Sequence, residues 1–453
     1  MRLPAYYPHR CILFLLVLFT QAAVAHALPT DSLKRATPPA PAPFSGDDTW
    51  MNGQNRMTKS GILLGDSSSP VTFTAYFDAY YDHSFNHPSD HTITGSTSIG
   101  RDAEFVPNLA SIGFNIELQH VLATLEFQFG NSLTLISDGD QSFGHGRNLD
   151  AGSLRNIREA TGGYHFDNVG YGLNIEAGVF QAFTGLESYL LQENWNYQRS
   201  FVGDYVPGYL TGIRVTYYPR LDLSTSFWLF NGWSTFGVIT NGLGIGSSTT
   251  YRPRESVSYI LNAYLGRDTK NVVGRNRLHV DGSLLWRYRD SPRAYGISKM
   301  ALSLNAHAGF ETGGVDPVTG APLPGADSAH MFGAALANRI WFDHNKYALT
   351  LRVDALYDPL RYFTVPPLPI GFLPEVGPIK NELLWGVTVT YDIMPTENLT
   401  IRTEFTSRHS NIPFFAGANG TTSSDGWVGT SGSFTPDLVQ NETRLTAAIL
   451  VRL

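Results

Sequence analysis

Apolar and polar residues alternate along much of this chain, and residues 171–218 show the pattern most clearly. Every second residue from Tyr171 to Val179 is apolar, and small or polar residues stand between them. The alternation stops in a long polar and aromatic segment and resumes at Tyr209. A period of two predicts half-buried β-strands. The apolar face of such strands meets a second sheet in a sandwich, but it meets lipid in a membrane barrel.

The same alternation recurs along the chain and predicts a strand in each case. The predicted strands cover residues 71–82, 109–119, 123–130, 158–166, 171–180, 209–218, 221–230, 243–251, 257–266, 277–289, 300–311, 330–342, 347–357, 382–393, 399–408 and 442–453. Segment 243–251 is included because a barrel with both termini in the periplasm needs an even number of strands. The predicted fold class is all-β, a transmembrane antiparallel β-barrel of about 16 strands with short periplasmic turns and long extracellular loops. Such a barrel is wide enough for an aqueous channel.

The N-terminal end carries the features of an exported protein. Arg2 and Arg10 are followed by an apolar run, and Ala25-His26-Ala27 is a small-x-small cleavage pattern, so residues 1–27 are predicted to be a cleaved signal peptide. Residues 28–66 begin with a proline- and alanine-rich stretch and are predicted to form a periplasmic tail. Within this tail, residues 49–66 are compatible with a short plug or helix. The barrel is expected from 67 to 453.

Composition narrows the choice of function. The 453 residues carry a net charge of −7, which argues against nucleic acid as a partner. Aromatic residues make up 13% and charged residues only 16%, a balance that suits a barrel with aromatic girdles at its strand ends, where Trp341 is one candidate. The single cysteine, Cys11, lies in the leader, so the mature chain has neither disulfides nor thiolate metal ligands.

Several short stretches, in order, resemble the OmpL-like beta-barrel porin-2 family. They are Asn86-His87-Pro88 with Glu104-Phe105, Gly178-Val179-Phe180 with Gly185, Glu187, Asn194 and Arg199-Ser200, and Phe230-Asn231-Gly232-Trp233 with Asn241. The resemblance covers most of the predicted mature chain and implies a porin-like channel in the bacterial outer membrane. The family's acidic residue after the glycine at Gly266 is replaced by Arg267.

The segment 182–207 is the third predicted outer loop, and a third loop that folds into the lumen narrows a porin. Charges held opposite each other at such a constriction orient solutes and set selectivity. A loop packed against the rim, with solvated charges, is the alternative. The candidate constriction residues are Glu187, Glu193, Arg199 and Asp204 from the loop and Arg214, Arg287, Arg352 and Arg402 from the wall.

Metal and catalytic sites receive little support from the sequence. His83, His87 and His91 share a spacing that would align three imidazoles on a helix, but Pro88 lies among them, so no metal site is expected there. His279, His307, Asp281 and Ser283 lie on comparable strand faces, yet their spacing singles out no nucleophile with a base. We expect no enzyme activity and no cofactor.

The sequence therefore predicts an outer-membrane porin, a passive diffusion channel for small hydrophilic solutes. One alternative is a sugar-selective channel in which Trp195, Tyr197 and Tyr205 stack against the solute. Others are a barrel enzyme and a structural barrel with a closed lumen. The expected partners are outer-membrane lipid and small hydrophilic solutes. A homotrimer is one assembly suggested by residues 334–337, an alanine-rich run expected on the outer wall.

Overall fold

The computed structural model describes most of the chain after the predicted leader. The described residues are 43–56, 61–65, 69–137, 140, 142–143, 150–239, 242–267, 274–315, 320–322, 329–364, 381–423, 425–427 and 434–453. All of them belong to one compact unit that begins at Ala42. The predicted signal peptide and the first part of the predicted tail lie outside these residues.

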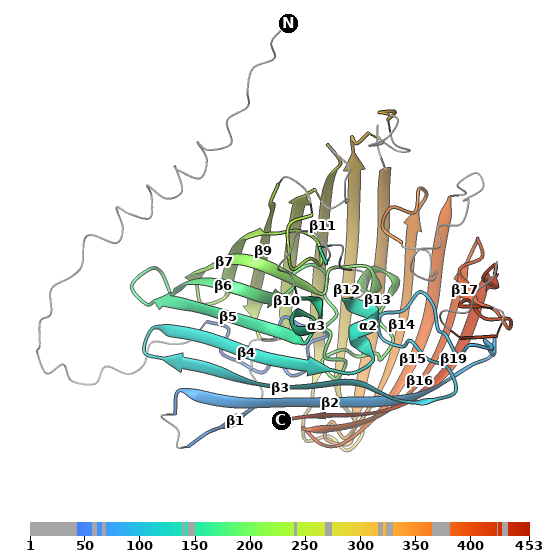
Figure 1. Cartoon of the computed structure of the whole chain (residues 1–453). Coiled ribbons are helices and arrows are strands. Elements are labelled where there is room, and N and C mark those ends of the chain that lie inside the picture. The colour runs from blue at the N-terminus through green and yellow to red at the C-terminus, as the bar shows by residue number, and fades with distance from the viewer. Residues whose placement is uncertain are drawn as a thin grey trace, which may run out of the picture. The chain divides into compact units, whose positions relative to one another are not determined.

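Sixteen antiparallel strands of the described chain close into one barrel, because the last strand pairs with the first. They are β2 (Val71–Ser84), β3 (Phe105–Leu118), β4 (Val121–Phe129), β5 (Ile157–Phe166), β6 (Leu173–Gln181), β7 (Tyr209–Arg220), β8 (Leu223–Phe230), β9 (Gly244–Arg254), β10 (Val257–Gly266), β11 (Asn276–Asp290), β12 (Ile297–Thr312), β13 (Ala329–Phe342), β14 (Tyr347–Asp358), β15 (Glu382–Thr396), β16 (Leu399–Ser410) and β19 (Asn441–Arg452). Each strand pairs with its neighbours in the chain, and β19 lies beside β2 (Figure 1).

Smaller elements accompany the barrel. They are β1 (Ile62–Leu63), which pairs with β2, the β17 (Phe415–Ala416) and β18 (Leu438–Val439) pair, and the helices α2 (Ser132–Ile136), α3 (Ala151–Leu154) and α4 (Phe201–Asp204). Among the described residues, no helix is long and apolar enough to span a membrane.

Strand β14 shows why the sequence forms a membrane barrel. Leu351 and Val353 are 51% and 45% exposed, whereas Arg352 between them is 2% exposed. Apolar side chains on the outside and polar ones on the inside reverse the arrangement of a soluble protein and match a barrel wall in lipid.

The predicted strands agree with the structure in number and order, and the predicted fold class is confirmed. Strand β9 is the segment that only the parity argument required. The largest boundary difference is in β3, which begins at Phe105 instead of residue 109, because Phe105 still pairs with Tyr81 of β2. Trp341 is a correction: it is 6% exposed and packs inside the barrel, so it is no part of an outer aromatic girdle.

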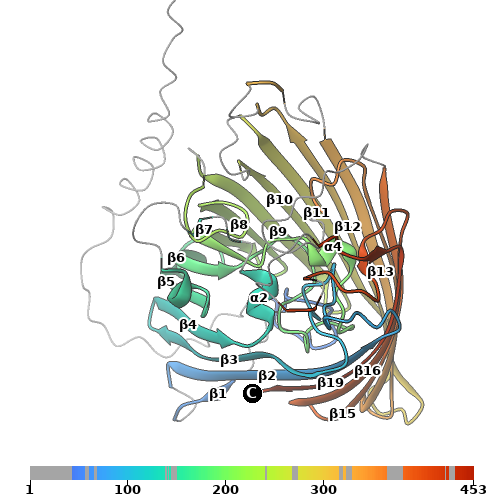
Figure 2. The ribbon, with the colours of Figure 1, turned by 45° about the vertical axis from the view of Figure 1, so that its right-hand side comes forward.

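Two segments lie inside the barrel. Loop 3 (residues 182–208, between β6 and β7) carries α4, which Figure 2 shows within the ring of strands. The N-terminal segment (residues 43–56) packs Trp50 and Met51 against loop 3 and the inner faces of several strands. This part of the predicted periplasmic tail is therefore built into the barrel, because its aromatic and apolar side chains find a core there.

Candidate channel constriction

Loop 3 runs through the barrel from the end with long loops to the end with short turns. Its Trp195 packs against Trp341, the last residue but one of β13, next to the turn 343–346. The Gln192 amide donates to the backbone carbonyl of Glu397, in the turn between β15 and β16. The loop thus crosses the full depth of the lumen along one wall.

Arg352 of β14 is the main link between this wall and loop 3. Its guanidinium lies 3.2 Å from a carboxylate oxygen of Glu187 and 3.0 Å from Asp354 on its own strand. It also donates to the backbone carbonyls of Gln198 and Arg199. All of these acceptors are buried, so Arg352 holds the loop and does not face open water.

Arg402 of β16 also links the wall to loop 3, at residues of the loop nearer the short turns. It forms a two-point pair with Asp392 of β15 at 2.7 and 2.9 Å. It also donates to the backbone carbonyls of Leu191 and Asn194 at 3.0 and 2.9 Å. Two-point pairing fixes the guanidinium plane, and the remaining N–H groups bind the loop.

Acidic wall residues bind the loop's backbone N–H groups. Glu404 accepts from the N–H groups of Tyr197 and Gln198, both at 2.7 Å. Asp354 accepts from the N–H of Phe201 at 2.9 Å. Because loop backbone groups inside a barrel have no ladder partner, these carboxylates replace the missing hydrogen bonds.

The tip of loop 3 also binds the first outer loop. Asp204 accepts hydrogen bonds from the backbone and hydroxyl of Thr97 at 2.9 and 2.7 Å. Arg199 donates to the same hydroxyl and stacks its guanidinium on Tyr189, 4.4 Å from the ring centre. Burial raises the pKa of Asp204 although Arg408 and Arg199 oppose the shift. Burial likewise raises the pKa of Glu187 against the effect of Arg352.

The N-terminal segment closes the lower part of this assembly. Asp47 lies 2.8 Å from Arg287 of β11 and 3.5 Å from Lys299 of β12. Burial alone would raise the pKa of Asp47, but its hydrogen bonds to Thr49 and the two cations lower it. Arg287 therefore pairs with the N-terminal segment.

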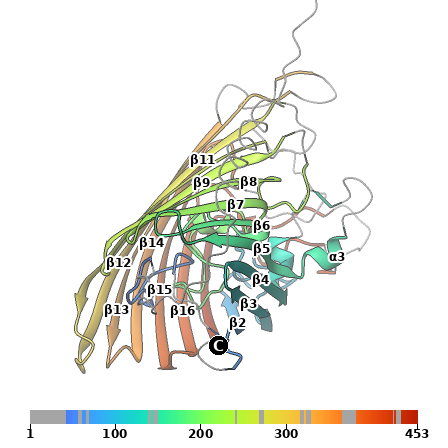
Figure 3. The ribbon, with the colours of Figure 1, turned by 90° about the vertical axis from the view of Figure 1, so that its left-hand side faces the viewer.

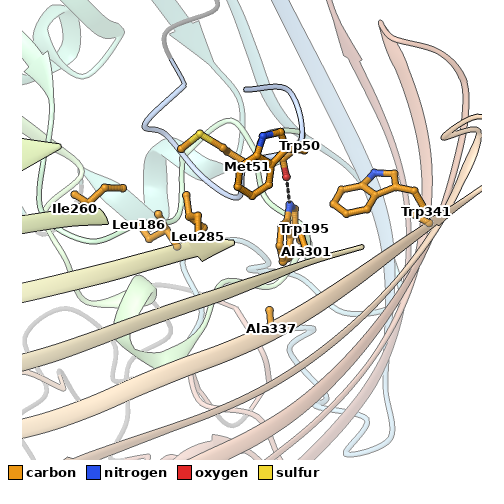
Figure 4. Packing of buried hydrophobic residues seen from close by; sticks show 10 residues of the cluster. Trp50, Met51, Leu186, Trp195, Ile260, Leu285, Ala301, Ala337 and Trp341 are labelled. Carbon is orange, nitrogen blue, oxygen red and sulfur yellow. Dashed lines mark hydrogen bonds between the residues drawn. The ribbon is translucent and has the colours of Figure 1, made fainter. Parts of the chain in front are cut away.

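Glu193 joins the N-terminal segment, loop 3 and the end of β19. Its carboxylate lies 2.5 Å from Arg452, and its carbonyl accepts from Gly53 and Arg56. Burial would raise the pKa of Glu193, yet Arg452 and Arg56 together lower it. Beside this junction the Trp195 indole donates to the Trp50 carbonyl (Figure 4).

The barrel wall on the other side of the lumen from the strands that bind loop 3 has more exposed inward side chains. Strands β4 to β9 are consecutive neighbours in the sheet (Figure 3). Inward hydroxyls of β4, β8 and β9 are partly exposed, and we call this set the hydroxyl wall: Thr124, Ser224, Ser226, Ser248 and Thr250. On β5 and β7, Thr161 and Thr216 are buried at 8% each. Inward threonines beneath loop 3 are buried in contrast, at 0% for Thr350, 1% for Thr388 and 1% for Thr406.

Arg214 of β7 stands among the strands of the hydroxyl wall. It lies 2.8 Å from Glu176 of β6, and its side chain is 26% exposed. Its guanidinium also stacks on Phe180 and Trp228. Of the eight candidate constriction residues, Arg214 is the one whose charge stays partly open to solvent.

The structure therefore divides the candidate residues into groups. Glu187 and Arg352 form a pair between loop and wall, and Arg402 contacts the loop through its carbonyls. Arg214 and Arg287 do not contact loop carboxylates: Arg214 pairs with Glu176 of the neighbouring strand, and Arg287 pairs with Asp47 of the N-terminal segment. Sequence patterns did not reveal Asp392 and Glu404 as anchors, although their inward position on alternating strands could have suggested it.

The sequence also singled out aromatic residues for sugar stacking, a set of histidines and an outward alanine-rich run. Trp195 and Tyr197 are 2% and 0% exposed, so they offer no free ring faces to a sugar. His91 bonds to the backbone of Asp102, and among the described residues His83, His87 and His91 form no metal-ligand group. On the outer wall, Ala334 faces outward but Ala335 and Ala337 face inward and are buried, so the outward run is not continuous.

Comparison with known proteins adds a family. The family described as "Putative beta-barrel porin-2, OmpL-like" matches residues 70–452. The chain belongs to this family. It is thus a porin, a passive channel of the outer membrane, and family and fold indicate a channel rather than an enzyme.

Solved porins share the fold of this family member. Outer-membrane expressed OmpT of Vibrio cholerae is 8% identical, with 86% of this chain and 100% of that chain covered and a TM-score of 0.51. An anion-selective porin from Comamonas acidovorans is 10% identical, with 84% and 99% covered and a TM-score of 0.50. A search of curated proteins found no match.

Proposed function

We propose that small hydrophilic solutes cross this porin between loop 3 and the hydroxyl wall. The observation that carries the proposal is the contrast in exposure: inward hydroxyls of β4, β8 and β9 are partly exposed, whereas those of β14 to β16 are buried beneath loop 3. Hydroxyl groups both donate and accept hydrogen bonds, so a wall of them exchanges partners with water and with hydrophilic solutes at little cost.

Charge selectivity along this route is assigned to Arg214 and Glu176. The Arg214 side chain is 26% exposed and that of Glu176 only 10%, so the arginine charge is the one that reaches a passing ion. The charges of loop 3 are buried and paired with the wall, as Glu187 is with Arg352, so they hold the constriction in place without facing it. Six of the eight candidate residues thus act as supports of the constriction: Glu187, Glu193, Arg199, Asp204, Arg352 and Arg402.

The mature form is proposed to begin after residue 27 and to assemble as a homotrimer. The leader rests on the cleavage pattern Ala25-His26-Ala27. The trimer rests on the apolar outer wall, where Phe114 and Phe127 are 40% and 38% exposed and could cover one another between copies. N-terminal sequencing and light scattering of the purified outer-membrane protein test these two statements separately.

Cysteine accessibility tests the route. The only cysteine is Cys11, so a mature chain cleaved after residue 27 lacks thiols and accepts single probes without background. Ser226→Cys and Ser248→Cys place a thiol on the hydroxyl wall, and Thr406→Cys places one beneath loop 3. A charged methanethiosulfonate reagent should reduce single-channel conductance in the first two variants and leave the third unchanged. Block of Thr406→Cys alone, or of none, would overturn the route.

A further inference from the structure

Two histidines and an aspartate gather on the inner face of β11 and β12. His279, Asp281 and His307 each offer one ligand atom, and these atoms all lie within 4.8 Å of one another. The strand register explains the gathering, because Asp281 pairs directly with His307 and His279 lies two residues before Asp281 on the same face. The three side chains are at most 4% exposed.

Hydrogen bonds fix one of the two imidazoles. The amide nitrogen of Asn305 donates to the carbonyl of Gly282 and to the hydroxyl of Ser283, so its oxygen faces His307. That oxygen lies 2.7 Å from His307 Nε2 and can only accept, so Nε2 carries the proton. The Nδ1 atom of His307 is therefore unprotonated and carries a lone pair.

That lone pair faces the second histidine. His307 Nδ1 lies 2.9 Å from His279 Nε2. His279 Nε2–H therefore donates to His307 Nδ1, and the other nitrogen of His279, Nδ1, is buried without a hydrogen-bond partner. Hydrogen bonding within the pair is therefore incomplete: one imidazole nitrogen of His279 has no partner, and the lone pair of His307 Nδ1 meets only the second imidazole.

The carboxylate has acceptor capacity to spare. One oxygen of Asp281 accepts from Asn262 at 2.8 Å, and the other accepts from the backbone N–H of Gly185 at 3.1 Å. Each carboxylate oxygen has about two lone-pair sites, so one on each remains for another partner. The neighbouring positive charge of Arg277 is paired with Glu311 at 2.7 Å.

We propose that His279, His307 and Asp281 bind a divalent transition-metal ion of the zinc class. Two imidazoles and one carboxylate are a known three-ligand set for such ions, whereas Mg²⁺ and Ca²⁺ prefer oxygen alone. Two donors on one tetrahedral Zn²⁺ lie about 3.3 Å apart. The ligand atoms lie within 4.8 Å of one another, so a bound ion would draw them closer by at most about 1.5 Å. Asn305, Asn262 and the Gly185 N–H form the outer shell that orients the ligands.

The surroundings suit a retained ion. The ring of Phe363 stacks on His279 with centroids 5.3 Å apart, and Trp233 meets the same ring edge-on. These rings keep bulk water away from the ligands. Because Asp281 also binds Gly185 at the start of loop 3, an ion here fastens the loop to the wall. The proposal concerns this loop anchor and holds independently of the solute route.

The test is metal binding by the full mature chain, folded in detergent and freed of metal with a chelator. Titration with Zn²⁺ should show one site and raise the melting temperature, and Co²⁺ should give visible absorption bands of nitrogen and oxygen ligands. His307→Gln and Asp281→Asn should each weaken Zn²⁺ binding at least ten-fold. Asn305→Ala, a change in the outer shell, should weaken it about ten-fold.

Controls separate this site from other histidines. His330→Gln changes a histidine on the outer side of β13. His83→Gln and His87→Gln change one histidine at the end of β2 and one in the first outer loop. All three substitutions should leave the affinity unchanged. Heat-modifiable migration on a gel shows which variants fold. If His307→Gln does not fold, Asp281→Asn still tests the site, because asparagine has nearly the same size and shape as aspartate. The proposal is overturned if the wild-type chain binds no Zn²⁺ or if the His83 and His87 substitutions abolish its binding.

Discussion

The indole N–H of Trp195 donates to the backbone carbonyl of Trp50 at 3.1 Å, although 145 residues separate the two in sequence. The two side chains are 2% and 1% exposed. The bond joins loop 3 to the N-terminal segment. Loop 3 thus rests on a segment that precedes the first barrel strand. A mutation that destabilises the N-terminal segment should therefore also destabilise loop 3.

Replacing Trp50 with alanine should loosen this joint assembly. A buried Trp→Ala change costs about 3–5 kcal/mol, and the cavity would lie directly beside Trp195. We expect larger and noisier single-channel conductance in planar bilayers, because loop 3 loses its lower support. The matched control is Trp385→Ala, since Trp385 is 45% exposed on the outer wall. Equal effects of the two variants would argue against a link between the N-terminal segment and the loop.

Glu187→Gln should destabilise the upper part of loop 3. The change keeps the size of the side chain but removes the charge that faces Arg352 at 3.2 Å and weakens the acceptor for the Ser200 hydroxyl. A hydrogen bond to a charged group contributes about 1.5–3 kcal/mol, but burial opposes the charge of Glu187 and raises its pKa. Because Asp354 also still faces the arginine, we expect a loss at the lower end, about 1.5 kcal/mol. Urea unfolding of the folded barrel measures it.

The control for this variant is Glu397→Gln, which changes an exposed carboxylate in the turn between β15 and β16. It should alter the free energy of unfolding by less than about 0.5 kcal/mol. A Glu187→Gln variant as stable as this control would show that the buried pair with Arg352 does not hold the loop.

The barrel was largely predictable because its information is local. Alternation with a period of two identifies most of the strands, and the need for an even strand number adds β9. Segment ends were less certain where the alternation is interrupted, as at Pro107 in β3. The inward placement of Arg352 and Arg402 followed from the same alternation.

The interior was not predictable in this way, because its contacts join distant segments. Nothing local in residues 43–56 indicates that Trp50 meets Trp195 or that Asp47 meets Arg287. Alternation places His279 and His307 on comparable faces, but only the register of β11 with β12 makes them neighbours. Contacts between segments inside a barrel depend on how the loops fold, and the alternation of apolar and polar residues does not predict how a loop folds.

Acid should weaken the junction at Glu193. Its pKa is lowered in the folded state, so its contribution to stability is present above the ordinary value near 4.5 and is lost as the pH falls through the lower folded value. The pKa values of Glu187 and Asp204 are raised, so these groups act in the opposite direction. The informative quantity is therefore the difference between wild type and Glu193→Gln.

That difference in unfolding free energy should be largest near neutral pH and shrink below about pH 4.5. Urea unfolding at several pH values measures it. A difference that stays constant from neutral pH to about pH 3 would mean that the charge of Glu193 does not support the junction.

Arg214→Gln should shift ion selectivity toward cations. The change removes the partly exposed positive charge at the hydroxyl wall and leaves Glu176 unpaired, so the local potential becomes more negative. The reversal potential under a KCl gradient should move in the cation-selective direction, and the shift should shrink at high salt because the charges are screened. Arg220→Gln removes an equal charge at the end of β7, where the side chain is 58% exposed and pairs with Asp222. If Arg220→Gln moves the reversal potential as far as Arg214→Gln, the effect comes from net charge and Arg214 does not face the route of the ions.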